Sequence, residues 1–508
     1  MADPIYQRVP QLEVSESSEA PRWANASRAW ARKGRRPFLL IGLLIVVALA
    51  GIAVWTPGFD AVHSSKAKTD LAEVEGGLGE EVQPVLKSCP VPPEEPWMHP
   101  ASSLNFGYPT TTLRENLRDD TYYVTSFAQA GFTNQFIACL HLIYLGHLTG
   151  RVPVIPPIVP AAHISSTAGL IPFSSIFNLT LLRTALRTPV IEWHDGKHIE
   201  ANASVSFPTS SSDPALDHFG CWSTRPLSAN HAGYVENDEN ALRIDMSFTR
   251  VPKHVYFNDL HTTFYGLSSI ITPGHRHAAA EEGRLAIMHP SRLGKATKPE
   301  ERMSCFDMLF FVSTGVREFE FEEPWSPAWA RVGKFLRFAD GLEGVGLAYV
   351  RKAFGLEKEE AIPPLITVHI RRGDFGGNCK PGEKPPCFLP LSAYKDSVED
   401  VRKEIFEKHK IEVDRVLVAS NEDDPAFWKT IDSYGWKYFN HTSSRTVETY
   451  GEWHPLLLDK VALSLGVGFV GTMPSTFSVY NARRVEDWND GVTRLLNYWS
   501  YKPPVKTT

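Results

Sequence analysis

The last third of the chain alternates short apolar runs with longer stretches that mix apolar and charged residues. The apolar runs are rich in valine, isoleucine and leucine, which is typical of buried strands in a parallel sheet. The strands are predicted at 365–370, 415–419 and 468–471. The stretches between them predict helices over 397–409, from Pro425, over 456–465 and from Pro474 towards Asp487. Alternating strands and helices predict βαβ units that form a parallel sheet.

A weaker version of this pattern lies earlier in the chain. Residues 121–126 predict a strand, and a helix follows from Thr133 because its apolar positions recur every three or four residues. Residues 151–155 predict the next strand, which Pro156 ends. Residues 160–300 are rich in Ser, His and Pro with few periodic runs, so we expect inserted loops there. A chain of 508 residues has room for two or three domains.

Before these elements, residues 38–55 form an uncharged apolar run. At about 1.5 Å per residue this run just spans a hydrocarbon core about 30 Å thick. The basic cluster 32–36 precedes it directly, which places residues 1–37 in the cytosol by the positive-inside rule. A cleaved signal peptide has a shorter apolar core nearer the N-terminus, so an uncleaved type II membrane anchor is the better interpretation.

Residues 56–115 are rich in Pro, Gly, Glu and Ser and predict a stem, with order beginning near Tyr122. All six cysteines follow the anchor, on the side of the membrane where disulfides persist. Cys379 and Cys387 flank a Pro- and Gly-rich loop and are predicted to be bonded, the alternative being two unrelated thiols. Glycosylation triplets, which suit a secretory-pathway protein, lie at Asn178, Asn202 and Asn440.

Charge and cysteine spacing argue against two classes of protein. A net charge of −6 lacks the basic excess that a general nucleic-acid binder needs. The sequence contains no Cys-x-x-Cys pair, so we expect no structural zinc site.

Two loops at the ends of predicted strands carry the candidate chemistry, because open parallel sheets bind ligands beyond the carboxyl ends of their strands. In the first loop, Gly471 ends a buried strand and small hydroxyl residues open a helix. The unpaired N–H groups at a helix start bind anions, and Ser475 and Thr476 add hydroxyl donors. Alternatively, Ser475 caps its own helix.

The second loop, 368–374, reads VHIRRGD. Arginine binds phosphate oxygens through two parallel N–H groups. Strand alternation points His369 and Arg371 to one face and Arg372 to the other. Arg371 is therefore the candidate phosphate ligand, and Arg372 or Asp374 would brace the loop in an ion pair. The alternative is a surface Arg–Asp bridge of little energetic worth.

Four peptides follow one another in a fixed order along the chain. They are GFTNQ at 131–135, VHIRRGD at 368–374, VASNEDDP at 418–425 and FVGTMPSTFS at 469–478. This ordered set resembles the Gly-x-x-Asn-Gln, His-x-Arg-x-x-Asp, acidic-loop and Ser-x-Phe-Ser peptides of the GDP-fucose protein O-fucosyltransferase family. The resemblance extends from about residue 122 to 490.

The resemblance implies a GT-B-like α/β fold in which two Rossmann-like domains face each other across a cleft. The implied divisions are a cytosolic tail (1–37), an anchor (38–55), a stem (56–115), an acceptor-side domain (116–355) and a nucleotide-sugar domain (356–508). It also implies inverting transfer of fucose from GDP-fucose to a protein or glycan acceptor, without an essential metal or cofactor. The catalytic part would lie in the lumen, anchored in the Golgi or ER membrane.

Carried onto the matching positions, the resemblance assigns roles to the candidate residues. Arg371 would neutralise the β-phosphate as the glycosidic bond breaks, and His369 would lie near the nucleoside. Ser475, Thr476 and Phe477 would hold the phosphates. The implied nucleotide-sugar site also includes Arg372, Asp374 and Asp423.

Three assignments stay open. Asn134 would face the cleft near the fucose and the acceptor, unless it caps its own helix. Several relatives carry an acidic residue that reads the guanine edge at the position of Val467, so Asp423 or Asp459 would have to replace it here. The candidates for a general base are Glu192, Glu452 and His454, each of which also suits an ordinary structural role.

Two other functions fit the same residues. Val467 is compatible with a different nucleotide sugar, and the unassigned base is compatible with a non-catalytic lumenal protein that binds a nucleotide or a glycan. Arg371 counts against the non-catalytic alternative, because binding alone does not require that side chain. The sequence does not identify the acceptor.

Overall fold

The computed structural model describes residues 95–128, 130–200, 207–224, 232–257, 261–274, 287–377, 379–380, 382–384 and 386–501. All of them belong to one compact unit, Pro90–Thr508. The predicted cytosolic tail, the anchor at 38–55, Cys89 and Asn202 lie outside the described residues. Within the described ranges, no helix is both long and apolar enough to cross a bilayer.

The N-terminal half is built on a sheet with the strand order β3-β2-β1-β9-β4-β5-β8. Neighbouring strands run parallel, except that β5 and β8 pair antiparallel at one edge. The strands are β1 (Tyr123–Ser126), β2 (Val152–Ile155), β3 (Ile191–Glu192), β4 (Asp217–Ser223), β5 (Ile244–Arg250), β8 (Ile287–His289) and β9 (Met303–Phe306). A small hairpin of β6 (Tyr256–Phe257) and β7 (His261–Thr262) follows β5.

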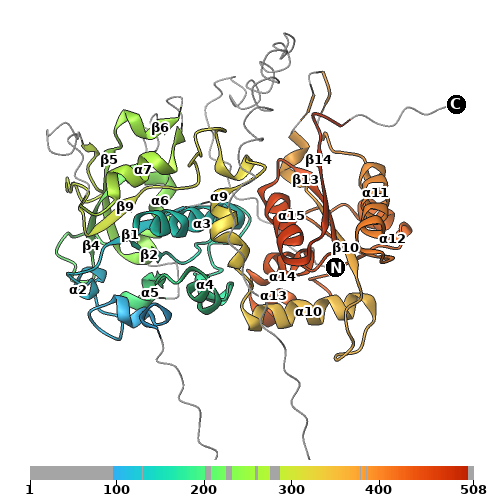
Figure 1. The fold of residues 1–508 in the computed structure, drawn as a ribbon, viewed down its shortest axis with the longest axis horizontal. Coiled ribbons are helices and arrows are strands. Elements are labelled where there is room, and N and C mark those ends of the chain that lie inside the picture. The colour runs from blue at the N-terminus through green and yellow to red at the C-terminus, as the bar shows by residue number, and fades with distance from the viewer. Residues whose placement is uncertain are drawn as a thin grey trace, which may run out of the picture. The chain divides into compact units, whose positions relative to one another are not determined.

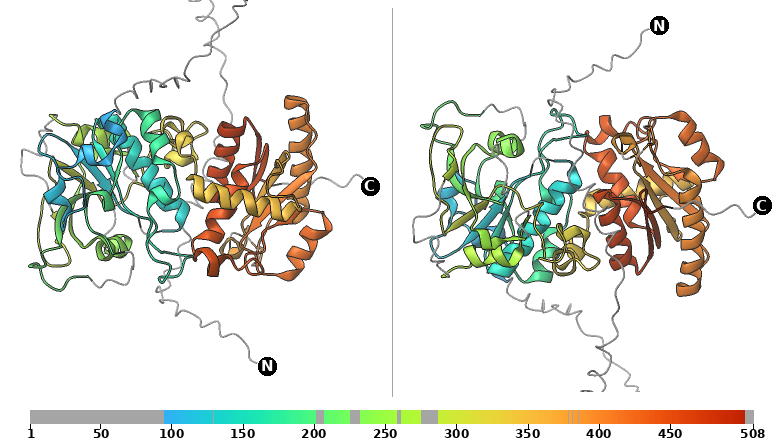
Figure 2. Two further views of the ribbon diagram at one scale, coloured as in Figure 1. Left: turned by 90° about the horizontal axis from the view of Figure 1, so that it is seen from below. Right: turned by 90° about the horizontal axis from the view of Figure 1, so that it is seen from above.

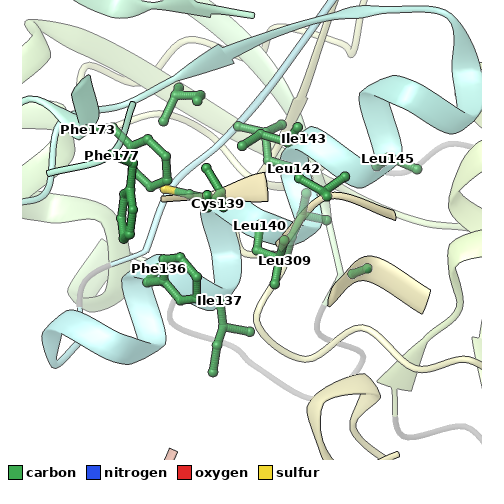
Figure 3. Packing of buried hydrophobic residues seen from close by; sticks show 14 of the residues in the cluster. Phe136, Ile137, Cys139, Leu140, Leu142, Ile143, Leu145, Phe173, Phe177 and Leu309 are labelled. Atoms are coloured by element: carbon green, nitrogen blue, oxygen red, sulfur yellow. The ribbon is translucent and has the colours of Figure 1, made fainter. Parts of the chain in front are cut away.

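Helix α3 (Phe132–Thr149) packs against β1 and β2 (Figure 1). Its apolar side chains form part of the largest buried cluster, in which Phe136, Phe173 and Phe177 lie close together (Figure 3). The strand predicted at 121–126 and the helix predicted from Thr133 are therefore confirmed. The other helices of this half are α2 (Leu113–Asn116), α4 (Leu179–Leu186), α5 (Trp193–Gly196), α6 (Ala232–Leu242), α7 (Phe264–Ile271) and α9 (Pro327–Arg331).

The prediction that inserted loops make up residues 160–300 is wrong. This segment supplies β3, β4, β5 and β8 of the sheet together with helices α4 to α7. Strands β4 and β5 are buried along almost their whole length, yet they carry buried polar side chains, among them Asp217, Ser223, Asp245 and Ser247. These polar positions interrupt the apolar pattern by which a buried strand is normally recognised.

The predicted end of the stem was also wrong, because order begins well before Tyr122. Leu104, Leu113 and Leu117 are buried in a cluster with strands of the first sheet. The backbone N–H of Leu113 donates to the buried carboxylate of Asp217 at 2.9 Å. Only Leu113 and Leu117 have helical spacing, and that pair is too short a pattern to predict a helix, so the burial of the three leucines depends on tertiary contacts.

The C-terminal half is built on a fully parallel sheet with the order β12-β11-β10-β13-β14. Its strands are β10 (Leu365–Ile370), β11 (Arg415–Ser420), β12 (Lys437–Tyr438), β13 (Gly468–Met473) and β14 (Val492–Asn497). Three of them confirm the sequence predictions, and the two edge strands were not predicted. The chain leaves β10 towards β11 and β12 and then returns to β13 on the other side. The switch point of the sheet therefore lies between β10 and β13, where ligands of such sheets bind.

Helices cover both faces of this second sheet (Figures 1 and 2). They are α10 (Asp340–Phe354), α11 (Leu391–His409), α12 (Pro425–Ser433), α13 (Thr446–Tyr450), α14 (His454–Ser464) and α15 (Thr476–Asn489). The mixed α/β architecture with parallel sheets is thus confirmed. Helices α3 and α15 join the two halves, since Phe136 and Tyr480 belong to one buried cluster and their ring centroids are 5.2 Å apart.

The predicted disulfide between Cys379 and Cys387 is confirmed. A second disulfide joins Cys221 of β4 to Cys305 of β9, which are direct partners in the register of the two strands. Cys139 on α3 is a buried free thiol.

The two disulfides are expected to stabilise the fold unequally, because a cross-link removes more entropy from the unfolded chain when it closes a longer loop. Cys221–Cys305 spans 84 residues and Cys379–Cys387 spans 8. Replacing the first pair by alanine should lower the free energy of unfolding by about 4 to 5 kcal/mol, and the second by about 2 to 3 kcal/mol. Urea unfolding of the two double variants measures both losses, and an equal or reversed order would contradict the prediction.

Candidate active site

The two candidate loops leave the sheet side by side at the switch point. Arg371 directly follows β10, while β13 ends at Met473, whose peptide bond to Pro474 is cis. The backbone N–H of Arg371 donates to the hydroxyl of Thr472 at 2.9 Å. The same hydroxyl lies 2.7 Å from that of Tyr394, which comes from α11. Thr472 therefore fixes the two loops to each other.

Helix α15 presents its N-terminus to this point. Ser475 occupies the N-cap position of the backbone. Within the described part of the chain, however, its hydroxyl makes no capping hydrogen bond, so the alternative that the Ser475 side chain caps the helix is wrong. The first backbone N–H groups of α15 thus keep their capacity to bind an anion. Thr476 donates its hydroxyl hydrogen to the amide oxygen of Asn134 at 3.0 Å.

Asn134 brings the start of α3 to the same place. Gly131 is the N-cap of α3, so the alternative that Asn134 caps the helix is wrong. Gly131 offers no side-chain oxygen, and the described residues provide no side-chain cap at this end either. Two uncapped helix N-termini, from the two halves of the protein, therefore meet at the hydrogen bond between Asn134 and Thr476.

The guanidinium of Arg371 is held by two side chains, Asp374 and His163. Its Nη2 is 2.9 Å from a carboxylate oxygen of Asp374 and 2.9 Å from Nε2 of His163. Arginine can only donate, so Nε2 of His163 accepts and that ring carries its proton on Nδ1. Asp374 orients the guanidinium from one side, which leaves other N–H groups of Arg371 for a ligand. No pattern in the sequence indicates that His163 contacts Arg371.

Arg372 is held by a different set of side chains from those that hold Arg371. Its Nε donates to the carboxylate of Glu422 at 2.7 Å, and its guanidinium lies over the rings of Phe388 and Phe427 at 4.0 and 5.2 Å. Partial burial raises the pKa of Glu422, but the hydrogen bond and charge of Arg372 outweigh this effect, and the pKa lies below its ordinary value. Arg372 thus braces the loop and holds the acidic peptide 420–424 against it.

His369 is buried beneath the phosphate-binding candidates. Its Nδ1 is 2.7 Å from the hydroxyl of Ser478, and its ring stacks on Phe477 with centroids 4.5 Å apart. Burial, with the positive charge of Arg371, moves the pKa of His369 well below its ordinary value, so the ring is neutral. His369 and Phe477 therefore form one packed pair under the start of α15.

The guanine-reading candidates are not brought together by the structure. Asp423 lies exposed on the loop after β11, whereas the carboxylate of Asp459 is 3.2 Å from Nε2 of His441. Val467 packs against the buried cluster of the second sheet. The residue that would read a base stays open among these positions.

The general-base candidates have structural partners. Glu192 is buried and forms a capping box with Asp195 at the start of α5. Glu452 accepts a hydrogen bond from Thr167 at 3.0 Å. His454 is half-buried, and its ring lies 5.4 Å from that of Tyr450. These contacts favour the structural roles over a role in proton transfer.

A hollow opens beside the two loops. It is lined by aromatic side chains, both arginines and a threonine, among them Arg371, Arg372, Phe388, Tyr394, Thr472 and Trp499. In the described part of the chain, no group of three or more His, Cys, Asp or Glu side chains is placed to hold a metal ion. The site therefore offers arginine, hydroxyl and backbone N–H donors, which suit a phosphate ligand.

Comparison with known proteins gives no match to a protein-family model and none to a curated sequence. Solved structures do match. POFUT1 in complex with GDP-fucose is 14% identical, with 75% of this chain and 98% of that chain covered and a TM-score of 0.42. The NodZ α-1,6-fucosyltransferase soaked with GDP-fucose is 11% identical, with 72% and 92% covered and a TM-score of 0.32. Fucosyltransferase NodZ from Bradyrhizobium is 12% identical, with 72% and 93% covered and a TM-score of 0.33. The printed names of the two NodZ structures give each as a fucosyltransferase.

Proposed function

We propose that this protein is an inverting glycosyltransferase that transfers fucose from GDP-fucose to a protein or glycan acceptor. The observation that carries the proposal is the meeting of Arg371 with the uncapped start of α15 at the switch point of a parallel sheet. Each supplies donors for one part of a diphosphate. The resemblance of the four ordered peptides supports fucose as the sugar.

In the proposed reaction, the bond between the fucose anomeric carbon and the β-phosphate oxygen breaks, and an acceptor oxygen bonds to that carbon from the opposite face. The leaving diphosphate gains one negative charge, and the acceptor hydroxyl releases its proton to water. Arg371 is the fixed cation beside the phosphate oxygens on which this charge develops. Electrostatic stabilisation of this kind is often the largest contribution of an enzyme to the rate.

The surrounding residues position that cation and the diphosphate. Asp374 orients the guanidinium of Arg371, while Arg372 and Glu422 hold the loop from behind. Ser475, Thr476 and the first N–H groups of α15 would bind the phosphates. Asn134, fixed by Thr476, would face the fucose and the acceptor. The proposed mechanism gives no chemical role to a metal ion.

The predicted anchor at 38–55 completes the proposal. We place the catalytic part in the lumen of the Golgi or the ER, as a type II membrane protein held by one helix. The cysteine usage supports this location, because disulfides such as Cys221–Cys305 and Cys379–Cys387 persist in oxidising compartments.

Two alternatives are kept for testing. In the first alternative, the enzyme uses a nucleotide sugar whose base is not guanine, which Val467 would allow because it replaces the acidic residue that reads guanine in relatives. A non-catalytic lumenal protein would bind the nucleotide and transfer nothing, which the structural roles of Glu192, Glu452 and His454 would allow.

The nucleotide preference is expected to appear in thermal unfolding. A ligand that binds the folded protein stabilises it by mass action, by about 2.7 kcal/mol at a concentration one hundred times its dissociation constant. GDP should therefore raise the melting temperature of the purified full-length chain in detergent more than UDP or ADP does. A larger shift with UDP would overturn the fucose assignment. If GDP binds but no fucose is transferred from GDP-fucose to any glycoprotein acceptor, the result favours the non-catalytic alternative.

A further inference from the structure

Lys460 lies on α14 beneath the proposed diphosphate site and is completely buried. Its Nζ makes no hydrogen bond to any described part of the chain. The amine lies 3.8 Å from the centroid of the Phe477 ring and 5.5 Å from that of Phe132. A buried lysine head group without a partner is rare, because lysine almost always reaches solvent or an anion.

The two rings locate the amine relative to the helix N-termini. Phe132 is the first residue of α3, and Phe477 is the second residue of α15. Both helices start without a side-chain cap among the described residues, and Asn134 and Thr476 connect their first turns. The amine therefore lies behind the place where the positive ends of two helices meet.

The charged groups around Lys460 are also positive. Arg484 of α15 lies close enough to act on the charge of Lys460. His369 of β10 stacks on the same Phe477 ring and has Arg371 as a further positive neighbour. Asp459, its neighbour on α14, is engaged with His441. From α3, Phe132 faces the amine with its ring, which does not titrate. Burial and the charge of Arg484 move the pKa of Lys460 well below its ordinary value.

A charged amine in these surroundings would be costly. Transfer of an unpaired ammonium into a protein interior is so unfavourable that the group usually loses its proton instead. The attraction to the Phe477 and Phe132 rings offsets only a small part of this cost. Without a ligand, Lys460 is therefore a neutral amine, and a bound anion is what would stabilise its charged form.

We propose that Lys460 is the buried counter-charge of the diphosphate site, neutral in the free protein and protonated when a nucleoside diphosphate binds at the start of α15. The inference rests on the proposed function, because it takes the diphosphate to be the ligand at this point. The step is balanced by one proton that the buffer loses and Nζ gains. Because binding raises the proton affinity of Lys460, GDP binding should weaken as the pH rises through the pKa that Lys460 has in the complex.

Proton uptake on GDP binding is measurable by calorimetry of the full-length chain in detergent at pH 8. At this pH the phosphates of GDP are fully ionised, since the second pKa of a terminal phosphate is about 6. The binding enthalpy of the natural protein should differ between HEPES and Tris, whose ionisation heats differ, with a slope that corresponds to uptake of up to one proton. Lys460→Met should bind GDP about tenfold more weakly, with an enthalpy that no longer depends on the buffer.

Lys403→Met is the matched control. Lys403 lies on α11 with its side chain 74% exposed, so the variant removes one formal charge without touching the site. It should bind GDP as the natural protein does and keep the buffer dependence.

The outcomes separate the inference from the proposed function. If GDP binds the natural protein with the same enthalpy in both buffers, the inference is overturned and the proposed function stands. Full buffer dependence in Lys460→Met would overturn it as well, because another group, such as His369, would then take up the proton. If GDP does not bind the natural protein at all, both are overturned. The buffer comparison on the natural protein decides the matter even if Lys460→Met does not fold.

Discussion

Arg371→Ala is expected to reduce fucose transfer about a thousandfold or more while leaving the fold intact. Loss of one fixed donor to a developing oxyanion typically costs a factor of about 100 to 1,000, and loss of an arginine that stabilises a transferring phosphate costs about 1,000 or more. The side chain is 17% exposed and its ion pair with Asp374 is half-exposed, so its removal should cost little stability. Release of GDP from GDP-fucose, in the presence of mixed secretory glycoproteins, measures the loss.

Arg402→Ala is the matched control for this variant. Arg402 also forms an ion pair with the carboxylate three residues away, Glu399, but it lies on α11, away from the two loops. It should leave transfer unchanged. Arg371→Lys should lie between the two, because it keeps the charge but loses the planar pair of donors. Transfer by Arg371→Ala at the natural rate, with an unchanged melting temperature, would show that the diphosphate is held elsewhere.

The sequence predicts the two loops of the candidate site because the patterns that indicate them are local. A strand of β-branched residues followed by two arginines, and a strand followed by small hydroxyl residues, each indicate a loop at a strand's carboxyl end. In the structure, the loop that carries Arg371, Arg372 and Asp374 directly follows β10. The pairing of β10 with β13, which no local pattern indicates, brings both loops to one point.

The residues that the sequence missed act over long distances. His163 comes from a segment without periodicity, and only the folded chain brings it to Arg371. Lys460 lies in the run LDKVAL, where a lysine suggests the exposed face of a helix. Its burial depends on α3 and α15 covering that face. Glu422 was visible only as one of several acidic residues in its loop, and nothing distinguished it from Asp423.

Glu320→Ala is expected to destabilise the protein by about 3 to 5 kcal/mol, which is the usual cost of leaving one member of a buried ion pair without its partner. Glu320 lies in the short 3-10 helix η5 (Glu320–Glu322). Its carboxylate is 3.1 Å from Nε2 of His141 on α3, and both side chains are fully buried. It also accepts hydrogen bonds from the hydroxyl of Ser326 and, at 3.0 Å, from the backbone N–H of Ala328 at the start of α9.

The loss of stability in Glu320→Ala should also affect the proposed active site. Arg483 of α15 donates to the carbonyl oxygens of Phe321 and Glu323, at 3.0 and 3.1 Å. The segment that Glu320 fixes is therefore attached directly to the helix whose start would bind the diphosphate. Urea unfolding of Glu320→Ala measures the stability. Glu322→Gln, two residues further on and exposed, is the control and should unfold like the natural protein.

The pH dependence of this effect distinguishes the carboxylate's charge from its packing. Burial would raise the pKa of Glu320, but the hydrogen bond and charge of His141, with the hydroxyl of Ser326, outweigh burial and lower it. A lowered pKa in the folded state means that the stabilisation is complete above the ordinary value of 4.5 and is lost as the pH falls through the folded-state pKa. The difference in unfolding free energy between the natural protein and Glu320→Gln should therefore be constant near neutral pH and shrink below about pH 4.5. A difference that stays constant down to pH 3 would mean that shape and hydrogen bonding, rather than charge, hold η5 against α3.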